Sequence, residues 1–160
     1  MMGVGKSTIG SSLSVRLNMK FKDMDKLIER SQGKSIKKIF SDEGEKYFRK
    51  IEKDMTLKIL DKKDSIISLG GGAFIDNEIR KKVKINCISF WLDSSISSLM
   101  KRSSGSNKRP LLDMDNLEIS LTNIYNSRKK IYQQANYRID CTKFDKKTII
   151  DNISKAYENH

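Results

Sequence analysis

Cysteine, histidine and long apolar runs are scarce in this sequence of 160 residues, and each scarcity narrows the possible functions. Cys87 and Cys141 lie far apart without the neighbours that a metal site needs, so a reduced, cytoplasmic protein is expected. The single histidine is the terminal His160, which excludes a Ser-His or Cys-His nucleophilic pair unless the tail folds back. No apolar run approaches a membrane span, and the amino terminus resembles neither a signal nor a transit peptide.

Charge of one sign is in surplus, with a formal net charge of +12 that would suit nucleic acid or a small anion. The lysines are spread along helical segments and form no stripe with interleaved aromatic side chains. The surplus is therefore interpreted as a compositional bias, and no nucleic-acid partner is expected. The length suits one domain over residues 1–160, and no repeat or long linker divides it.

Short β-branched runs alternate with longer helical patterns, which predicts an α/β domain with a parallel sheet. Strands are expected near residue 21 and over 65–69, 87–92 and 137–141. Helices are expected over about 7–17, 42–60 and 117–135 and from about 146, with shorter helical segments up to 29 and over 35–40. Asp42 and Glu45 have the spacing of a capping box, so the long helix is expected to begin at Asp42.

A phosphate-binding loop is the strongest motif, with the sequence Gly3-Val4-Gly5-Lys6-Ser7-Thr8 at the start of an amphipathic helix. Backbone N–H groups of such a loop curl around phosphate, and the helix amino terminus adds favourable potential. Lys6 would reach the β- and γ-phosphates and Ser7 would bind Mg²⁺; the alternative is a helix start without a ligand. A loop of this kind joins a strand to a helix, yet only Met1 and Met2 precede Gly3, so the leading strand and the first glycine of the motif are expected to be missing.

Three further groups of residues could carry chemistry. Asp23 and Asp25 would face one side of an extended segment and could serve Mg²⁺ and a substrate hydroxyl, although the pair alone fits an exposed turn better. The glycines at 70–72 would let backbone approach a ligand, or would simply form a turn. Arg49, Arg109 and Arg128 could each bind a carboxylate or phosphate, or form surface ion pairs.

Taken together, the motifs resemble the shikimate kinase family over nearly the whole chain. The matching segments are residues 2–10, 21–25, 28–29, 39–40, 43–45, 48–49, 52, 68–73, 109–112, 128 and 132. The resemblance implies a three-layer P-loop kinase fold with a parallel sheet in the order 2-3-1-4-5, of which the first, central strand is missing here. It also implies ATP-dependent phosphorylation of the 3-hydroxyl of shikimate, on the pathway to chorismate and the aromatic amino acids.

The resemblance further implies a role for each matching residue. The catalytic residues would be Lys6, Asp25, which contacts the reacting hydroxyl, and Arg109, which reaches over the transferred phosphate. ATP would be bound by Gly3, Val4, Gly5, Lys6, Ser7, Thr8, Arg109 and Arg102, the last of these along the adenine. Shikimate would be bound by Asp25, Gly71 and Gly72 and, through its carboxylate, by Arg49 and Arg128. Mg²⁺ would be held by Ser7, Asp23 and Ser68.

The resemblance places a substrate-binding region within about residues 24–60 and a lid within about 103–115. A monomer is expected, with ATP and shikimate as its partners and no membrane partner. Two rival interpretations stay open. One is a different small-molecule P-loop kinase, such as a gluconate or nucleotide kinase, against which the carboxylate, glycine and arginine set argues. The other is an inactive relative that binds nucleotide or a protein partner, which the incomplete loop favours and the full set of charged residues opposes.

Overall fold

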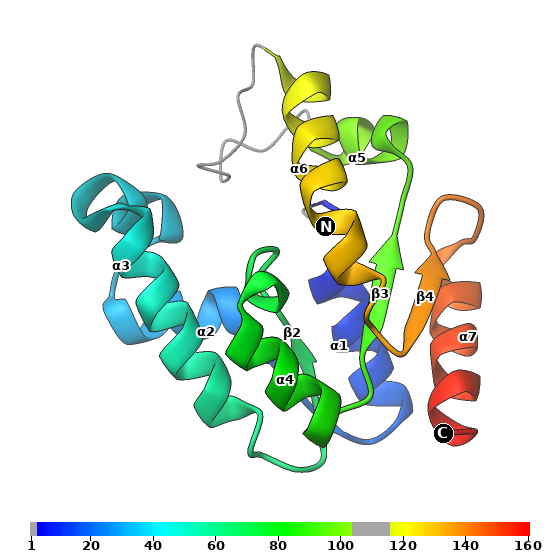
Figure 1. Cartoon of the computed structure of the whole chain (residues 1–160). Coiled ribbons are helices and arrows are strands. Elements are labelled where there is room, and N and C mark those ends of the chain that lie inside the picture. The colour runs from blue at the N-terminus through cyan, green and yellow to red at the C-terminus, as the bar shows by residue number, and fades with distance from the viewer. Residues whose placement is uncertain (1–2, 104–115) are drawn as a thin grey trace.

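Helices and strands alternate along the chain in the computed structural model, which describes residues 3–103 and 116–160 (Figure 1). In chain order the elements are α1 (Lys6–Arg16), β1 (Lys20–Asp23), α2 (Met24–Gln32), α3 (Ile36–Ile59), β2 (Ser65–Ser68), the 3₁₀ helix η1 (Ala73–Ile75), α4 (Asn77–Asn86), β3 (Phe90–Asp93), α5 (Ile96–Ser103), α6 (Leu117–Tyr132), β4 (Tyr137–Asp140) and α7 (Lys146–Glu158). This alternation confirms the predicted α/β class. The predicted lid and Arg109 lie outside the described residues, except for the helical Ser103 at the edge of the lid.

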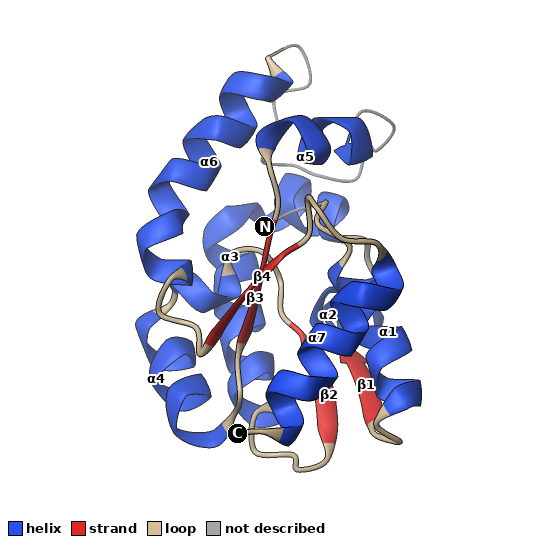
Figure 2. Ribbon diagram, turned by 90° about the vertical axis from the view of Figure 1, so that its right-hand side faces the viewer, coloured by secondary structure: helices blue, strands red, loops and turns tan. Residues whose placement is uncertain are grey.

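The strands form two separate parallel pairs. β1 pairs with β2, with Asp23 opposite Ser68, and β3 pairs with β4, with Asp93 opposite Asp140. No strand joins β2 to β3 within residues 3–103 and 116–160. The full strand order stays a prediction. Figure 2 shows α4 and α6 on one side of the strands and α1 and α7 on the other, so helices cover both faces.

Two apolar clusters hold these layers together. The main cluster joins α1, α4, α6 and α7 to the strands, and within it the rings of Trp91 and Tyr132 lie 6.0 Å apart. A smaller cluster of Ile28, Ile39 and Phe48 packs α2 against α3. Helices α2 and α3 therefore have an apolar contact of their own, at the edge of the molecule where α3 projects from the strands (Figure 1).

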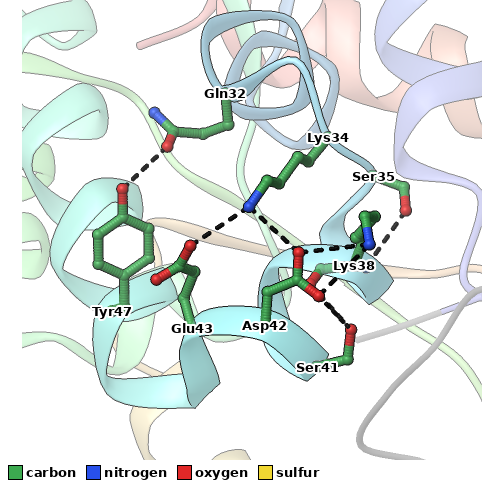
Figure 3. Close-up of polar contacts among 8 residues, drawn as sticks. All are labelled: Gln32, Lys34, Ser35, Lys38, Ser41, Asp42, Glu43 and Tyr47. Atoms are coloured by element: carbon green, nitrogen blue, oxygen red, sulfur yellow. Dashed lines mark hydrogen bonds and ion pairs between the residues drawn. The ribbon is translucent and has the colours of Figure 1, made fainter.

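Helix α3 contains a break at Gly44, whose φ of 80° and ψ of 170° lie in a region that only glycine adopts readily. The expected start of the long helix at Asp42 is wrong in detail, because the Asp42 side chain caps nothing. Its carboxylate pairs instead with Lys34 and Lys38, at 3.1 Å and 3.4 Å, as Figure 3 shows. The pair with Lys34 ties the first turns of α3 to the loop after α2, whereas the pair with Lys38 lies within α3.

Helix α4 was not expected from the sequence, and β3 begins later than predicted. Asp76 caps α4 by accepting hydrogen bonds from the backbone N–H groups of Glu78 and Ile79. Ile79 and Val83 then bury one face of the helix. Cys87, the expected first strand residue, is the carboxyl-terminal cap of α4, and β3 covers only Phe90–Asp93. A cap followed by apolar residues four apart was a signal that could have predicted this helix.

Candidate active site

Three oxygen-bearing side chains meet where β1 and β2 end. Asp23 and Ser68 are the last residues of these neighbouring strands and lie opposite each other in the register. Ser7, in the first turn of α1, donates a hydrogen bond from Oγ to Asp23 Oδ2 at 2.5 Å. Carboxylate and hydroxyl oxygens are the ligand types that Mg²⁺ prefers. The structure thus brings together all three residues that were predicted to hold the metal.

Asp25 lies one step further along the chain, in the first turn of α2. The Asp23 side chain caps this helix by accepting a hydrogen bond from the backbone N–H of Lys26. The cap fixes the position of Asp25 in the first turn. Burial raises the pKa of Asp25, against the opposing effect of the positive charge of Lys6 and with a further increase from Asp23. A carboxylate with a raised pKa beside the phosphate-loop lysine is suited to receiving a proton or a hydrogen bond from a hydroxyl group.

An ion pair on α3 faces Asp25. Arg49 Nη1 lies 2.5 Å from Glu52 Oε2, and its Nε donates to Glu45 Oε1 at 3.1 Å. The Glu52 side chain is only 4% exposed, and burial raises its pKa despite the charge of Arg49. A buried carboxylate without a partner costs free energy, so the ion pair between Glu52 and Arg49 is favoured and holds the Arg49 guanidinium in one orientation.

The glycine triplet after β2 lets these side chains approach its backbone. A Cβ atom at Gly70 would collide with the Glu52 carboxylate and lie 3.0 Å from Asp25 Oδ1. A Cβ atom at Gly72 would collide with the Arg49 guanidinium. Any larger residue at either position would therefore push the charged groups away from the loop. The structure shows that side chains of the site approach this backbone closely, while its approach to a ligand stays a prediction.

Helix α6 reaches the same loop from the opposite side. Arg128 Nη1 donates a hydrogen bond to the Gly71 carbonyl at 3.0 Å, and the Tyr132 hydroxyl donates to the same oxygen. Tyr132 is buried, and burial raises its pKa. Two donors from successive turns of one helix thus fix the Gly71 peptide. Arg49 of α3 and Arg128 of α6 therefore both reach the glycine triplet.

The phosphate loop lies beside this pocket. Val4 is buried, whereas Ser7 and Thr8 are exposed at the amino-terminal end of α1, where backbone N–H groups point outward. Arg102, on α5, donates from Nη1 to the Val4 carbonyl at 3.2 Å. The predicted adenine-side arginine is therefore in contact with the loop.

Sequence reasoning named most of the residues that converge here and missed two. Glu52 and Gly70 were not among the predicted site residues, although both stood in the segments that carried the family resemblance. Their positions in the sequence could have indicated them, because Glu52 follows Arg49 by three residues on a helix and Gly70 precedes the two glycines that were named.

Two general features of the described residues limit what the site can be. No group of three or more histidine, cysteine, aspartate or glutamate side chains in this part of the chain could hold a metal ion. A metal here would depend on hydroxyl oxygens and on a bound phosphate as well as on Asp23. Across the described ranges, none of the helices is long and apolar enough to cross a membrane.

A phosphate loop beside a carboxylate and two arginines has the residue types that a P-loop kinase for a small anionic acceptor requires. Comparison with known proteins narrows this class. The family model described as shikimate kinase matches residues 2–158, and the chain belongs to this family.

Individual relatives agree with this assignment. The shikimate kinase of Persephonella marina is 43% identical over 138 residues, which cover 86% of this chain and 83% of the relative. That of Bartonella quintana is 34% identical over 160 residues, or 100% of this chain and 76% of the relative. The solved structure of shikimate kinase from Acinetobacter baumannii in complex with shikimate has a TM-score of 0.94 at 30% identity, covering 99% of this chain and 89% of that one. The rival interpretations receive no support from these comparisons.

Proposed function

We propose that this protein transfers the γ-phosphoryl group of ATP to the 3-hydroxyl of shikimate by means of the residues that converge on the glycine triplet. ATP-dependent phosphorylation of shikimate is the reaction of the family to which the chain belongs, and it lies on the route to the aromatic amino acids. The observation that carries the residue assignment is the placement of Asp25, Arg49 and Arg128 around one loop beside Lys6.

The acceptor is held on the side of α3 and α6. Arg49 and Arg128 bind the shikimate carboxylate through their planar forks, and the backbone of Gly71 and Gly72 contacts the ring. Arg128 is available for this because Tyr132 also donates to the Gly71 carbonyl and keeps that peptide in place when Arg128 turns to the ligand. Asp25 orients the 3-hydroxyl toward the phosphate and accepts its proton as the bond to phosphorus forms.

The nucleotide is held on the side of α1. Residues 3–8 surround the phosphates, Lys6 balances the charge of the transferred group, and Arg102 lies along the adenine. Arg109 lies outside the described residues and is assigned to the transferred phosphate through the family resemblance alone. The oxygens of Ser7, Asp23 and Ser68 fit Mg²⁺, which when bound neutralises phosphate charge.

Several wider properties are part of the same proposal. The chain acts as one domain over residues 1–160, with the acceptor bound within residues 24–60 and with 103–115 as the lid that excludes water. It works in the cytoplasm as a monomer with ATP and shikimate as its partners, and neither nucleic acid nor a membrane takes part. The scattered lysines and the absence of a spanning helix in the described ranges support the last two points.

A coupled assay of ADP release tests the proposal, with ATP, Mg²⁺ and shikimate present. We expect release that depends on shikimate, and quinate or gluconate at the same concentration as controls should give far less. Nucleotide binding without shikimate-dependent release would identify an inactive relative and contradict the proposal.

A further inference from the structure

The two glutamates that bind Arg49 differ in how freely they can move. Glu52 Oε2 lies 2.5 Å from Arg49 Nη1, and the Glu52 side chain is only 4% exposed. Glu45 Oε1 lies 3.1 Å from both Nε and Nη2 of Arg49, and the Glu45 side chain is 52% exposed. Burial lowers the pKa of Arg49, but Glu52 and, to a lesser degree, Glu45 raise it above its ordinary value. Glu52 is thus the fixed partner of Arg49, and Glu45 is the partner that can turn into solvent.

Both edges of the Arg49 guanidinium that could bind a carboxylate are in use. A carboxylate binds this group most strongly through two parallel N–H bonds, either from Nε and Nη2 or from Nη1 and Nη2. Glu45 occupies the first edge, because one of its oxygens lies within reach of both nitrogens. Glu52 accepts from Nη1 and so occupies part of the second edge. A ligand carboxylate can therefore form two parallel bonds with Arg49 only by taking the place of one glutamate.

Glu45 is the glutamate that costs less to displace. Within residues 3–103 and 116–160, its carboxylate has no polar partner other than Arg49. It follows directly after the break at Gly44, so no continuous helix extends behind it. An exposed ion pair between residues four apart on a helix contributes little to stability. Removing the buried Glu52 from Arg49 would instead leave an uncompensated charge in the interior.

We propose that Glu45 is an internal substitute for the carboxylate of the acceptor. It occupies the Nε and Nη2 edge of Arg49 while the site is empty, and it leaves that edge when the acceptor binds. The inference rests on the proposed function, in which Arg49 binds the carboxylate of shikimate. Glu45 acts through Arg49 as a positioning residue: it keeps the guanidinium paired and oriented in the empty site, and it weakens acceptor binding by the free energy of its own pair. Glu52 stays in place throughout the exchange.

The first test measures the Kd for shikimate by calorimetry, without nucleotide, in the parent and in Glu45→Gln. Glutamine keeps the length of the side chain but loses its charge, so the Kd should fall about threefold, as expected for the loss of one exposed competing pair. Glu43→Gln is the matched control, because Glu43 pairs with Lys34 instead of Arg49, and it should leave the Kd unchanged. A higher Kd in Glu45→Gln would identify Glu45 as a clamp that Arg49 needs, and an unchanged Kd would show that Glu45 does not compete. Either result would overturn the proposal.

The second test observes the exchange itself through the NMR signal of the Arg49 Nε–H group, which donates to Glu45 in the empty site. The signal is assigned by its loss in Arg49→Lys. The signals of the parent and Glu45→Gln should differ without ligand and should coincide in saturating shikimate. Signals that still differ with shikimate bound would show that Glu45 remains on Arg49, and the proposal would be wrong.

Failure of the proposed function gives a different result. In that case the parent neither binds shikimate nor releases ADP in response to it, and both proposals fall together. Shikimate-dependent ADP release by the parent, combined with an equal or higher Kd in Glu45→Gln, would instead refute the role of Glu45 alone.

Discussion

The acceptor side and the nucleotide side of the candidate site are built in different ways. On the acceptor side, Arg49 is held by Glu52 on its own helix, and the Gly71 carbonyl receives two donors from α6. On the nucleotide side, the phosphate loop is fixed by α1 behind it and by the contact from Arg102.

This difference shows where the geometry of a kinase site comes from. On the proposed acceptor side, the charged residues of α3 and α6 are held by contacts within the described chain. The phosphate loop takes its position from α1, which packs in the main apolar cluster, and from the contact with Arg102. Acceptor recognition should thus be robust to changes around α1, and nucleotide binding should be sensitive to them. Three predictions, in order of decreasing effect, examine this contrast.

Replacement of Asp25 by asparagine has the largest expected effect. Asparagine keeps the shape but cannot accept the proton, so kcat should fall by about 100-fold or more while the Kd for ATP stays nearly unchanged. Steady-state kinetics and a nucleotide titration measure the two quantities. Asp54→Asn, at an exposed position of α3, is the matched control and should behave as the parent. Equal losses of turnover and nucleotide affinity in Asp25→Asn would remove the distinction between the two sides.

Arg49→Lys should have an intermediate effect confined to the acceptor side. Lysine keeps the charge but loses the planar fork, so the KM for shikimate should rise about tenfold. The KM for ATP should stay within about twofold. Arg30→Lys, on the exposed end of α2, serves as the control. If the KM for ATP rose as much as that for shikimate, Arg49 would act on the whole site and the comparison would fail.

The smallest expected effect concerns pH and stability. Burial raises the pKa of both Asp25 and Glu52 above their ordinary values of 3.8 and 4.5. The folded protein then holds these protons more tightly than the unfolded chain. Their contribution to stability is full below the ordinary values and is lost as pH rises through the raised ones. The ligand-free protein should therefore lose stability from these groups as the pH rises above their ordinary values of 3.8 and 4.5.

Glu52→Gln measures this contribution. Its Tm should fall less steeply with rising pH than that of the parent, so the Tm of the parent should drop by about 2–4 °C relative to that of the variant, the shift that ~1 kcal/mol produces in a domain of this size. Glu158→Gln, at the exposed end of α7, should leave the slope unchanged. Parallel curves for the parent and Glu52→Gln would show that the buried carboxylate does not hold its proton more tightly in the folded state.

The sequence predicted the fold where local signals agreed with one another. The loop and α1 combined glycines with an amphipathic pattern, and β2 was a β-branched run followed by glycines, so both were predicted within a residue or two. α4 was overlooked because its apolar residues are few, although Asp76 caps it. Asp42 has the spacing of a cap but is drawn to Lys34 and Lys38 of the surrounding surface, which spacing alone does not reveal.

The site was predictable for a different reason. Asp25, Arg49 and Arg128 are far apart in the chain, and no periodicity brings them together. Their convergence was inferred from the family resemblance. What the structure adds is the set of supporting contacts, such as Glu52 behind Arg49 and Tyr132 beneath Gly71, which depend on the packing of α3 and α6 around the triplet.

The break at Gly44 has a consequence for how α3 tolerates insertions. One extra residue in a continuous helix rotates every residue beyond it by about 100° about the helix axis. Such a rotation would turn Arg49 away from the residues that surround Glu52 at the candidate site. Because Gly44 interrupts the helix, the rotation caused by a residue inserted between Ile36 and Glu43 need not reach Arg49. The rotation caused by the same insertion between Glu45 and Arg49 would reach it. The tip of α3 can therefore vary in length while the pocket keeps its angular alignment.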